Sequence, residues 1–335
     1  MRSISRAVAA GSLLAMASGC APLEPAQNNA SLSAPPIETG DIDRFWATYD
    51  KVRATNDRPT QIALVQSGYL DNGSAGLKAF AAAKRCTAET YTDHMRNYPR
   101  FWDSLRARSL AARNLTVAIA PDLAKFRAVY PEMRPASVYF LVGCMTSAGT
   151  ASGDKVMFGT ELVMGNAQVD LSELPERGKK FFGAFYATDP EKTLPVLAIH
   201  EFVHTQQKEG ATGLLAQTVS EGAADFVTER VTGKLPNLLY MTFGPANDAA
   251  IKARFQADLA KGASADGWLY TGVDGSPFGV RDLGYYVGYA IAKSYYAKAQ
   301  DKRLALKQII ELDTTDAKAV ENYVAASGYF PARAQ

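Results

Sequence analysis

The sequence has almost no excess of charge of either sign, no internal repeat and few histidines. The 335 residues carry 36 basic and 34 acidic side chains, so the chain lacks the basic excess that is typical of nucleic-acid-binding proteins. No repeat or low-complexity segment interrupts a composition of 47% hydrophobic and 21% charged residues, which indicates a globular protein with one large domain or two small ones. There are only three histidines, and two of them lie four residues apart.

The chain begins with a segment that is typical of an export signal. Residues 1–19 join a short basic start to an apolar stretch that is too short to cross a bilayer as a helix of the mature protein. The sequence "ASGC" that ends at Cys20 resembles the lipobox of bacterial lipoproteins, which implies a lipid on Cys20; the alternative is an ordinary secreted protein. Ala21 resembles the pattern that is sent to the outer membrane, which implies an anchor on its periplasmic side.

The mature chain divides into a tether and a folded part. Residues 20–40 are rich in Pro, Ala, Ser and Asn without an apolar period, which predicts a flexible tether, and residues 41–335 form the predicted domain. Loss of residues 1–19 leaves 34 basic residues against 34 acidic ones, so we expect no nucleic-acid partner. Cys86 and Cys144 form either a disulfide in an oxidising compartment or two buried thiols.

Apolar spacings of three and four dominate the chain from Asp41 onward and predict helices. The middle differs, because "ASVYFLVG" (136–143) and "KVMFGTELVMG" (155–165) are β-branched and aromatic runs, which predict two strands of a small sheet. Helices return to the C-terminus and include residues 282–300. We therefore expect a mostly helical α+β fold with a small sheet beside the histidine-containing helix and a helical C-terminal part.

The stretch "LAIHEFVHTQQ" has the H-E-x-x-H pattern of a zinc-binding helix. Positions i and i+4 lie one above the other on a helix, so His200 and His204 can bind one ion while Glu201 orients and deprotonates the attacking water. Thr193 is the expected N-cap of this helix and Gly210 its end. The alternative is an amphipathic helix whose histidines have this spacing by coincidence.

A catalytic zinc site needs a third protein ligand. His94 lies far upstream in a segment where we expect an exposed helical histidine. The second helix, residues 213–233, follows a short Gly-containing turn, so the two helices should form an antiparallel pair with Glu221 opposite the middle of the motif. The same count places Glu229 about two turns away and Glu209 within the turn, so Glu221 is the expected ligand.

The neighbours of Glu221 are consistent with this choice. Asp225 lies one turn later and should face His200, where it can accept the second N–H of the imidazole and fix its tautomer. Gly222 is costly inside a helix, which suggests close approach of the two helices of the pair. The alternative for Glu221 and Asp225 is a solvated helix face.

This arrangement resembles the gluzincin metallopeptidases, the thermolysin-like class: H-E-x-x-H is followed on the next helix by E-x-x-x-D. The run "HEFVHTQQ…SEGAADFVTE", with "GYYVGY" near the C-terminus, is also similar to a group of bacterial zinc-dependent peptidases that includes gliding-motility-associated lipoproteins, over roughly residues 95–300. The resemblance implies that His200, His204 and Glu221 bind one Zn²⁺, that Glu201 is the general base and that Asp225 supports His200.

The histidine that thermolysin uses to bind the substrate oxyanion has no evident counterpart. In "RDLGYYVGY" the position of Tyr285 matches the G-Y-x-x-G pattern of the resembling group, so Tyr285 is the expected donor; alternatively, it belongs to a closely packed helix seam. We further expect "FGTELV" to be an edge strand for an extended peptide, with Glu161 meeting a substrate amine or simply exposed.

These observations predict a lipid-anchored, zinc-dependent hydrolase of the bacterial cell envelope that cleaves peptide bonds in a peptide or protein substrate. The rival interpretation is a non-catalytic envelope lipoprotein that keeps the fold for structure or binding. The intact base Glu201 argues against the rival, because a degenerate enzyme is expected to lose it first.

Overall fold

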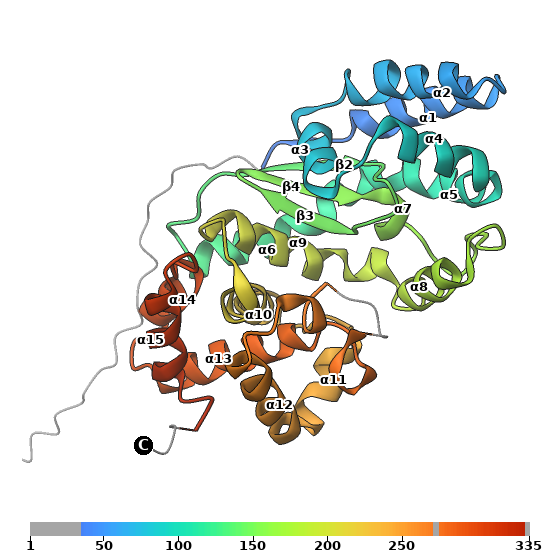
Figure 1. The fold of residues 1–335 in the computed structure, drawn as a ribbon. Coiled ribbons are helices and arrows are strands. Elements are labelled where there is room, and N and C mark those ends of the chain that lie inside the picture. The colour runs from blue at the N-terminus through green and yellow to red at the C-terminus, as the bar shows by residue number, and fades with distance from the viewer. Residues whose placement is uncertain (1–34, 271–274, 332–335) are drawn as a thin grey trace, which may run out of the picture. The chain divides into compact units, whose positions relative to one another are not determined.

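A small mixed β-sheet has helices packed against both of its faces (Figure 1). The computed structural model describes residues 35–270 and 275–331, apart from the side chains of residues 116 and 117; the predicted signal peptide and Cys20 lie outside these ranges. The strands are β1 (Ile37–Glu38), β2 (Ser137–Leu141), β3 (Gly149–Ser152) and β4 (Lys155–Gly159), in the order β1-β2-β4-β3. β1 and β4 run parallel to β2, while β3 is an antiparallel edge strand on β4.

Helices make up most of the remaining described chain, so the predicted mostly helical α+β class is confirmed. They are α1 (Gly40–Arg53), α2 (Arg58–Val65), α3 (Ala75–Lys84), α4 (Ala88–Asn97), α5 (Pro99–Ala111), α6 (Thr116–Val129), α7 (Thr160–Val163), α8 (Glu176–Tyr186), α9 (Pro190–Gln206), α10 (Gly213–Thr232), α11 (Leu239–Ala246), α12 (Asp248–Ala260), α13 (Leu283–Lys298), α14 (Lys302–Ile310) and α15 (Ala317–Ser327). Short π or 3₁₀ segments are η1 (Gln66–Leu70), η2 (Ala112–Leu115), η3 (Ala265–Gly267) and η5 (Pro277–Gly279). No helix in the described ranges is both long and apolar enough to cross a membrane.

The layers follow a simple order. Helices α1 and α3 cover one face of the sheet, and α9 covers the other face (Figure 1). Helix α10 then packs between α9 and α13. Residues Ile199, Phe202 and Val203 of α9 are fully buried, so one side of α9 belongs to the core while its histidine side faces α10.

Two sequence-based boundaries in the sheet region were wrong. Ile37 and Glu38 pair in register with Val138 and Tyr139, so the predicted tether of residues 20–40 extends too far. The predicted strand 155–165 stops at Gly159, and residues 160–163 form the short helix α7. Apolar residues continue beyond Gly159 as Leu162, Val163 and Met164, but the hydrogen-bonded ladder does not.

The ends of α9 also differ from the prediction. The helix begins at Pro190 after Asp189, which has a left-handed backbone (φ 55°), and Thr193 lies in its first turn instead of capping it. The Thr193 hydroxyl bonds to main-chain carbonyls within that turn. The helix ends at Gln206, four residues before Gly210.

Gly222 does mark a close approach of two helices, but the partner was predicted wrongly. A Cβ on Gly222 would lie 2.0 Å from the carbonyl carbon of Gly288 in α13, and a Cβ on Gly288 would lie 1.8 Å from the carbonyl oxygen of Thr218. The crossing therefore joins α10 to α13. Gly288 lies in a closely packed seam of α13, which is the alternative that the sequence offered for the helix of Tyr285.

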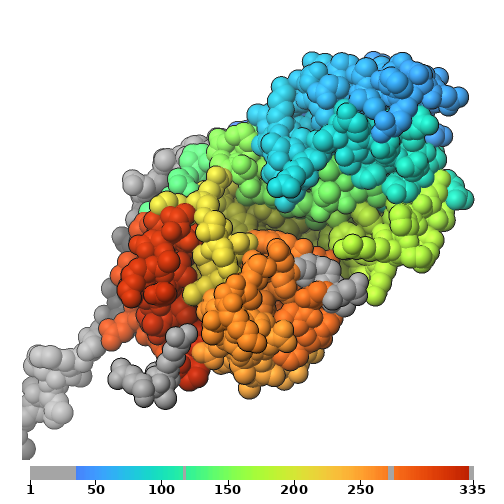
Figure 2. Space-filling model, viewed as in Figure 1, coloured from blue at the N-terminus to red at the C-terminus, as the bar shows by residue number. Residues whose placement is uncertain are grey.

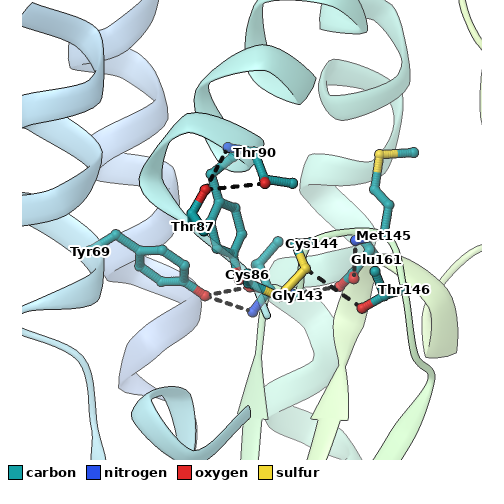
Figure 3. The surroundings of a disulfide bond; sticks show 11 residues. Tyr69, Cys86, Thr87, Thr90, Gly143, Cys144, Met145, Thr146 and Glu161 are labelled. Carbon is teal, nitrogen blue, oxygen red and sulfur yellow. Dashed lines mark hydrogen bonds between the residues drawn. A yellow bond between two sulfur atoms is a disulfide. The ribbon is translucent and has the colours of Figure 1, made fainter. Parts of the chain in front are cut away.

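Cys86 and Cys144 form a disulfide, which resolves the alternative that the sequence left open (Figure 3). Their Cα atoms lie 5.8 Å apart, within the ordinary range for a bridge. The bond attaches the segment after β2 to the segment after α3.

Candidate metal centre

The two histidines of α9 and Glu221 of α10 bring their ligand atoms to one point. Nε2 of His200 and Nε2 of His204 lie 3.3 and 3.1 Å from the same Oε2 of Glu221, and 3.0 Å from each other. All three atoms lie within 4.8 Å of one another, so the group can hold a metal ion. Of the carboxylates considered from the sequence, Glu221 is the one whose oxygen lies beside both histidines.

Asp225 fixes the orientation of His200. Nδ1 of His200 donates to Oδ1 of Asp225 at 2.9 Å, as the sequence predicts. The other oxygen of Asp225 accepts from the hydroxyl of Tyr240 in α11 at 3.0 Å, and both groups are buried. This chain keeps the proton of His200 on Nδ1 and leaves the Nε2 lone pair for the ligand position.

Gln207 has the same role toward His204. Its amide nitrogen donates to the carbonyl oxygen of Ser220 at 2.9 Å, which fixes the orientation of the amide. Its Oε1 must then accept, and Nδ1 of His204 donates to it at 2.7 Å. Both histidines are therefore held with Nδ1 protonated and Nε2 directed at Glu221.

The donor set fits a cation. With both histidines neutral, two Nε2 lone pairs and a carboxylate oxygen converge, and these groups repel one another unless a proton or a cation lies between them. Burial alone would lower the pKa of His200, but its hydrogen bonds with Asp225 and Glu221 outweigh burial and hold the pKa well above its usual range. A metal must therefore displace a proton here. Two imidazole nitrogens and one carboxylate oxygen form a set that suits zinc.

The second oxygen of Glu221 is also occupied. The hydroxyl of Tyr270 donates to Oε1 of Glu221 at 2.6 Å, and this leaves Oε2 as the atom that faces the histidines. Tyr270 has a left-handed backbone (φ 61°), which is unusual for a bulky residue, and 57% of its surface is exposed. Its ring contacts that of Tyr285 edge to face.

Glu201 lies beside the ligands and against the edge strand. It is only 6% exposed, and no described group donates a hydrogen bond to its carboxylate. A Cβ on Gly149 of β3 would lie 2.8 Å from Oε1 of Glu201, so strand and carboxylate are in direct contact. Burial raises the pKa of Glu201, while the neighbouring His200 and His204 oppose the rise. A buried carboxylate with this raised proton affinity is suited to proton transfer.

Tyr285 of α13 stands over the same cluster. Its ring stacks on His200 with centroids 6.1 Å apart and contacts Tyr240 at 5.3 Å. Tyr286 and Tyr289 of the same helix donate to Asp248 and Glu229, whereas the Tyr285 hydroxyl has no hydrogen-bond partner among the described residues. Burial raises the pKa of Tyr285 well above 10, so this phenol stays protonated as a donor.

Two other candidate residues lie elsewhere. His94 takes no part in the cluster and is half-buried in α4 beside Tyr98, so the prediction of an exposed histidine was wrong. Glu161 was predicted to be an edge-strand residue, either meeting a substrate amine or exposed, but it is fully buried in α7. Its carboxylate accepts from the backbone N–H groups of Gly143 and Met145.

Sequence reasoning missed four residues of the site. Gln207 lies three residues after His204, and that spacing could have identified it. Tyr240, Tyr270 and Gly149 had no signal of this kind, because they reach the cluster from separate elements.

The cluster is partly open to solvent. The side chains of His200, His204 and Glu221 are 11%, 20% and 12% exposed. Figure 2 shows the surface hollowed between the green part of the chain and the orange part that contains α11–α13. Two cavities of about 350 and 490 Å³ lie elsewhere, against α3 and between α14 and α15.

Comparison with known proteins adds no relative to this picture. No protein-family model matches the chain, and no curated protein and no solved structure matches it. The cluster of His200, His204 and Glu221 and the groups around it are therefore the basis for a proposed function.

Proposed function

We propose that this protein is a zinc-dependent peptidase of the bacterial cell envelope. The observation that carries the proposal is the convergence of His200, His204 and Glu221 on one point, with the buried carboxylate of Glu201 beside them. Three protein ligands that leave a further position open are typical of catalytic zinc sites, whereas structural sites are usually closed by four protein ligands.

The residues divide the chemistry among them. A bound zinc ion supplies Lewis acidity, which makes water a better nucleophile and polarises the carbonyl of the substrate. Glu201 accepts the proton of the attacking water and passes it to the leaving amine. Its burial supports this role, because a raised pKa brings the carboxyl group closer to the pH at which it must both take and release a proton.

Tyr285 is the candidate for stabilising the developing oxyanion. Its phenol is protonated, it stands over His200, and its hydroxyl has no hydrogen-bond partner among the described residues. A donor that is already oriented toward the reacting group stabilises charge that appears only in the transition state.

The edge strand β3 supports a peptide as the substrate. Among the described strands β3 pairs only with β4, and its Gly149 lies against Glu201. An extended peptide that pairs with the free edge of β3 would have its backbone beside the general base. The carbonyl to be cleaved and the carboxylate would then be neighbours.

The envelope location is carried by the sequence alone. The export signal of residues 1–19 and the lipobox-like cysteine Cys20 support a lipid anchor, and residues 21–34 then link the lipid to the folded part. The proposal includes no nucleic-acid partner.

The rival function is a non-catalytic lipoprotein of the same fold. A protein that used the metal only for structure would need the ligands and their supporting residues, but it would not need a buried carboxylate that accepts no hydrogen bond from the described residues. Glu201 therefore favours the enzyme.

Metal analysis of purified variants tests the proposal. We expect about one zinc per chain in the wild type and in Glu201→Gln, none in His204→Ala, and cleavage of a peptide library by the wild type only. Zinc in both proteins without cleavage by either would favour the rival. No zinc in any of them, even after zinc is added, would refute the metal site.

A further inference from the structure

The segment that joins β2 to β3 is fixed to the protein by several buried contacts. This crossover, residues 142–148, passes over the end of β4 and leads directly into the edge strand. The hydroxyls of Tyr69 and Tyr91 donate to the carbonyl oxygen of Val142 at 2.5 and 3.0 Å, and the N–H of Val142 donates back to Tyr69 at 3.1 Å. The disulfide of Cys144 adds a covalent attachment (Figure 3).

Glu161 lies inside the turn of this crossover. Oε2 accepts from the N–H of Gly143 at 2.7 Å and Oε1 from the N–H of Met145 at 3.1 Å (Figure 3). Met145 has a left-handed backbone (φ 61°), which costs energy for a residue with a side chain. The carboxylate thus holds a strained turn by two separate hydrogen bonds.

Position 161 places a carboxylate, and not a neutral side chain, in the protein interior. Glu161 is 0% exposed, and it forms no ion pair with any cation of the described residues. A buried charge without a partner is unfavourable. A glutamine of the same shape would be neutral, but one of its two terminal atoms is an NH₂ donor, which would face one of the two N–H groups instead of accepting from it.

The position of the crossover decides where β3 lies. The carbonyl of Ala148 accepts from the N–H of Gly159, and the next residue, Gly149, is the one that touches Glu201. Only three residues separate Met145 from Gly149, so a movement of the turn is passed on to the strand. Gly149 lies so close to Glu201 that even a Cβ would be too near its carboxylate, so a shift of the strand changes the distance between β3 and Glu201.

We propose that Glu161 is a positioning residue that holds the β2–β3 crossover and thereby sets the place of the edge strand β3 relative to Glu201. This inference rests on the proposed peptidase function, in which β3 binds the extended substrate. Glu161 is fully buried and its carboxylate bonds to the crossover instead of to the candidate metal ligands, so we expect it to act mainly on binding of the peptide through β3.

The test compares Glu161→Gln with Asp41→Asn in the mature protein. Asp41 serves as a control, because it is also a buried carboxylate (2% exposed) that accepts from a backbone N–H, that of Ser74, but it lies between α1 and α3 and also pairs with Arg44. The readouts are zinc content, kcat and KM on a fluorogenic peptide selected from the library, and amide hydrogen exchange of residues 143–152.

We expect Glu161→Gln to keep about one zinc, to raise KM about tenfold with kcat changed less than about twofold, and to speed exchange in residues 143–152. Asp41→Asn should leave KM and that exchange at wild-type values. A lower kcat with unchanged KM would show a loss of folded enzyme only and would overturn the proposal, as would wild-type exchange in Glu161→Gln.

Two further readouts keep the test decisive. If the wild type binds zinc but cleaves no peptide, the proposed function fails, while the exchange of β3 still decides whether Glu161 holds the strand. If Glu161→Gln does not fold, Tyr69→Phe removes the hydroxyl of η1 that bonds to Val142 of the same crossover. Faster exchange of residues 143–152 in that variant supports the role of the crossover, and unchanged exchange together with unchanged KM overturns it.

Discussion

Replacement of Gly222 by alanine has two opposing effects on the free energy of unfolding. Gly222 lies inside α10, where alanine is favoured over glycine by about 1 kcal/mol through helix propensity alone. At this position, however, the new Cβ would lie 2.0 Å from both the carbonyl carbon of Gly288 and the amide nitrogen of Tyr289. Propensity therefore predicts a more stable protein, and the helix crossing predicts a less stable one.

The magnitudes favour the steric effect. Non-bonded heavy atoms prefer separations of about 3.5–4.0 Å, so α10 and α13 would have to move apart by more than about 1 Å. The obstacle is backbone, which cannot move aside by changing a rotamer. Overpacking in a core costs about 1–3 kcal/mol and occasionally more, and here a whole helix interface would separate. We expect a net loss of at least about 3 kcal/mol in the free energy of unfolding.

Urea unfolding of the purified protein at fixed zinc concentration measures this loss. Gly183→Ala in α8 is the control, because its nearest contact would be a side-chain carbon of Leu171 at an ordinary 3.8 Å, and we expect it to be neutral or slightly stabilising. Since Gly222 follows the ligand Glu221, the variant should also bind zinc more weakly. A Gly222→Ala protein as stable as the wild type would refute the close crossing of α10 and α13.

Three further predictions follow from single contacts. Asp225→Asn and Gln207→Ala should each weaken zinc binding about 10–100-fold in a competition titration, because each removes the partner that orients a histidine; unchanged affinity would contradict this role. Burial raises the pKa of Glu161 from 4.5 to about 7, so the folded protein holds this proton more tightly than the unfolded chain. Its contribution to the free energy of unfolding should therefore be greatest below pH 4.5, fall by about 3 kcal/mol as the pH rises to about 7, and be absent in Glu161→Gln. Loss of the disulfide in a Cys86→Ser, Cys144→Ser double variant should cost about 4 kcal/mol by chain entropy for a separation of 58 residues, and a loss below about 1 kcal/mol would show that the bridge adds little.

The parts of the site that the sequence predicts correctly are those set by short-range geometry. The spacing of His200 and His204 follows from one helical turn, and the choice of Glu221 follows from an antiparallel pair with a short connection. The contact between Asp225 and His200 follows from the same pair. Each step needs only the helical period and the length of one turn.

The predictions were wrong where a sequence pattern indicates a contact or an element but does not identify the partner or the end of the element. Gly222 correctly indicated a close helix approach, yet nothing in its neighbourhood says that the partner is α13 and not α9. Glu161 lies in a run that was predicted to be one strand from its apolar and aromatic residues, but the ladder stops two residues earlier at Gly159. Tyr270 lies 49 residues from Glu221 in the chain, so no periodic pattern could connect them.

The surroundings of the cluster bear on the choice between the proposed enzyme and its rival. Each ligand has its second polar atom fixed by a different group, so the ligands are held in place whichever function the metal has. Buried polar groups in folded proteins almost always have hydrogen-bond partners. Glu201 accepts no hydrogen bond from the described residues, yet its oxygens are not among the fully buried unpaired atoms of those residues, so they are open to solvent water. A structural carboxylate in such a place would be expected to be bonded or replaced, whereas a general base must keep its oxygens free for the water that it deprotonates.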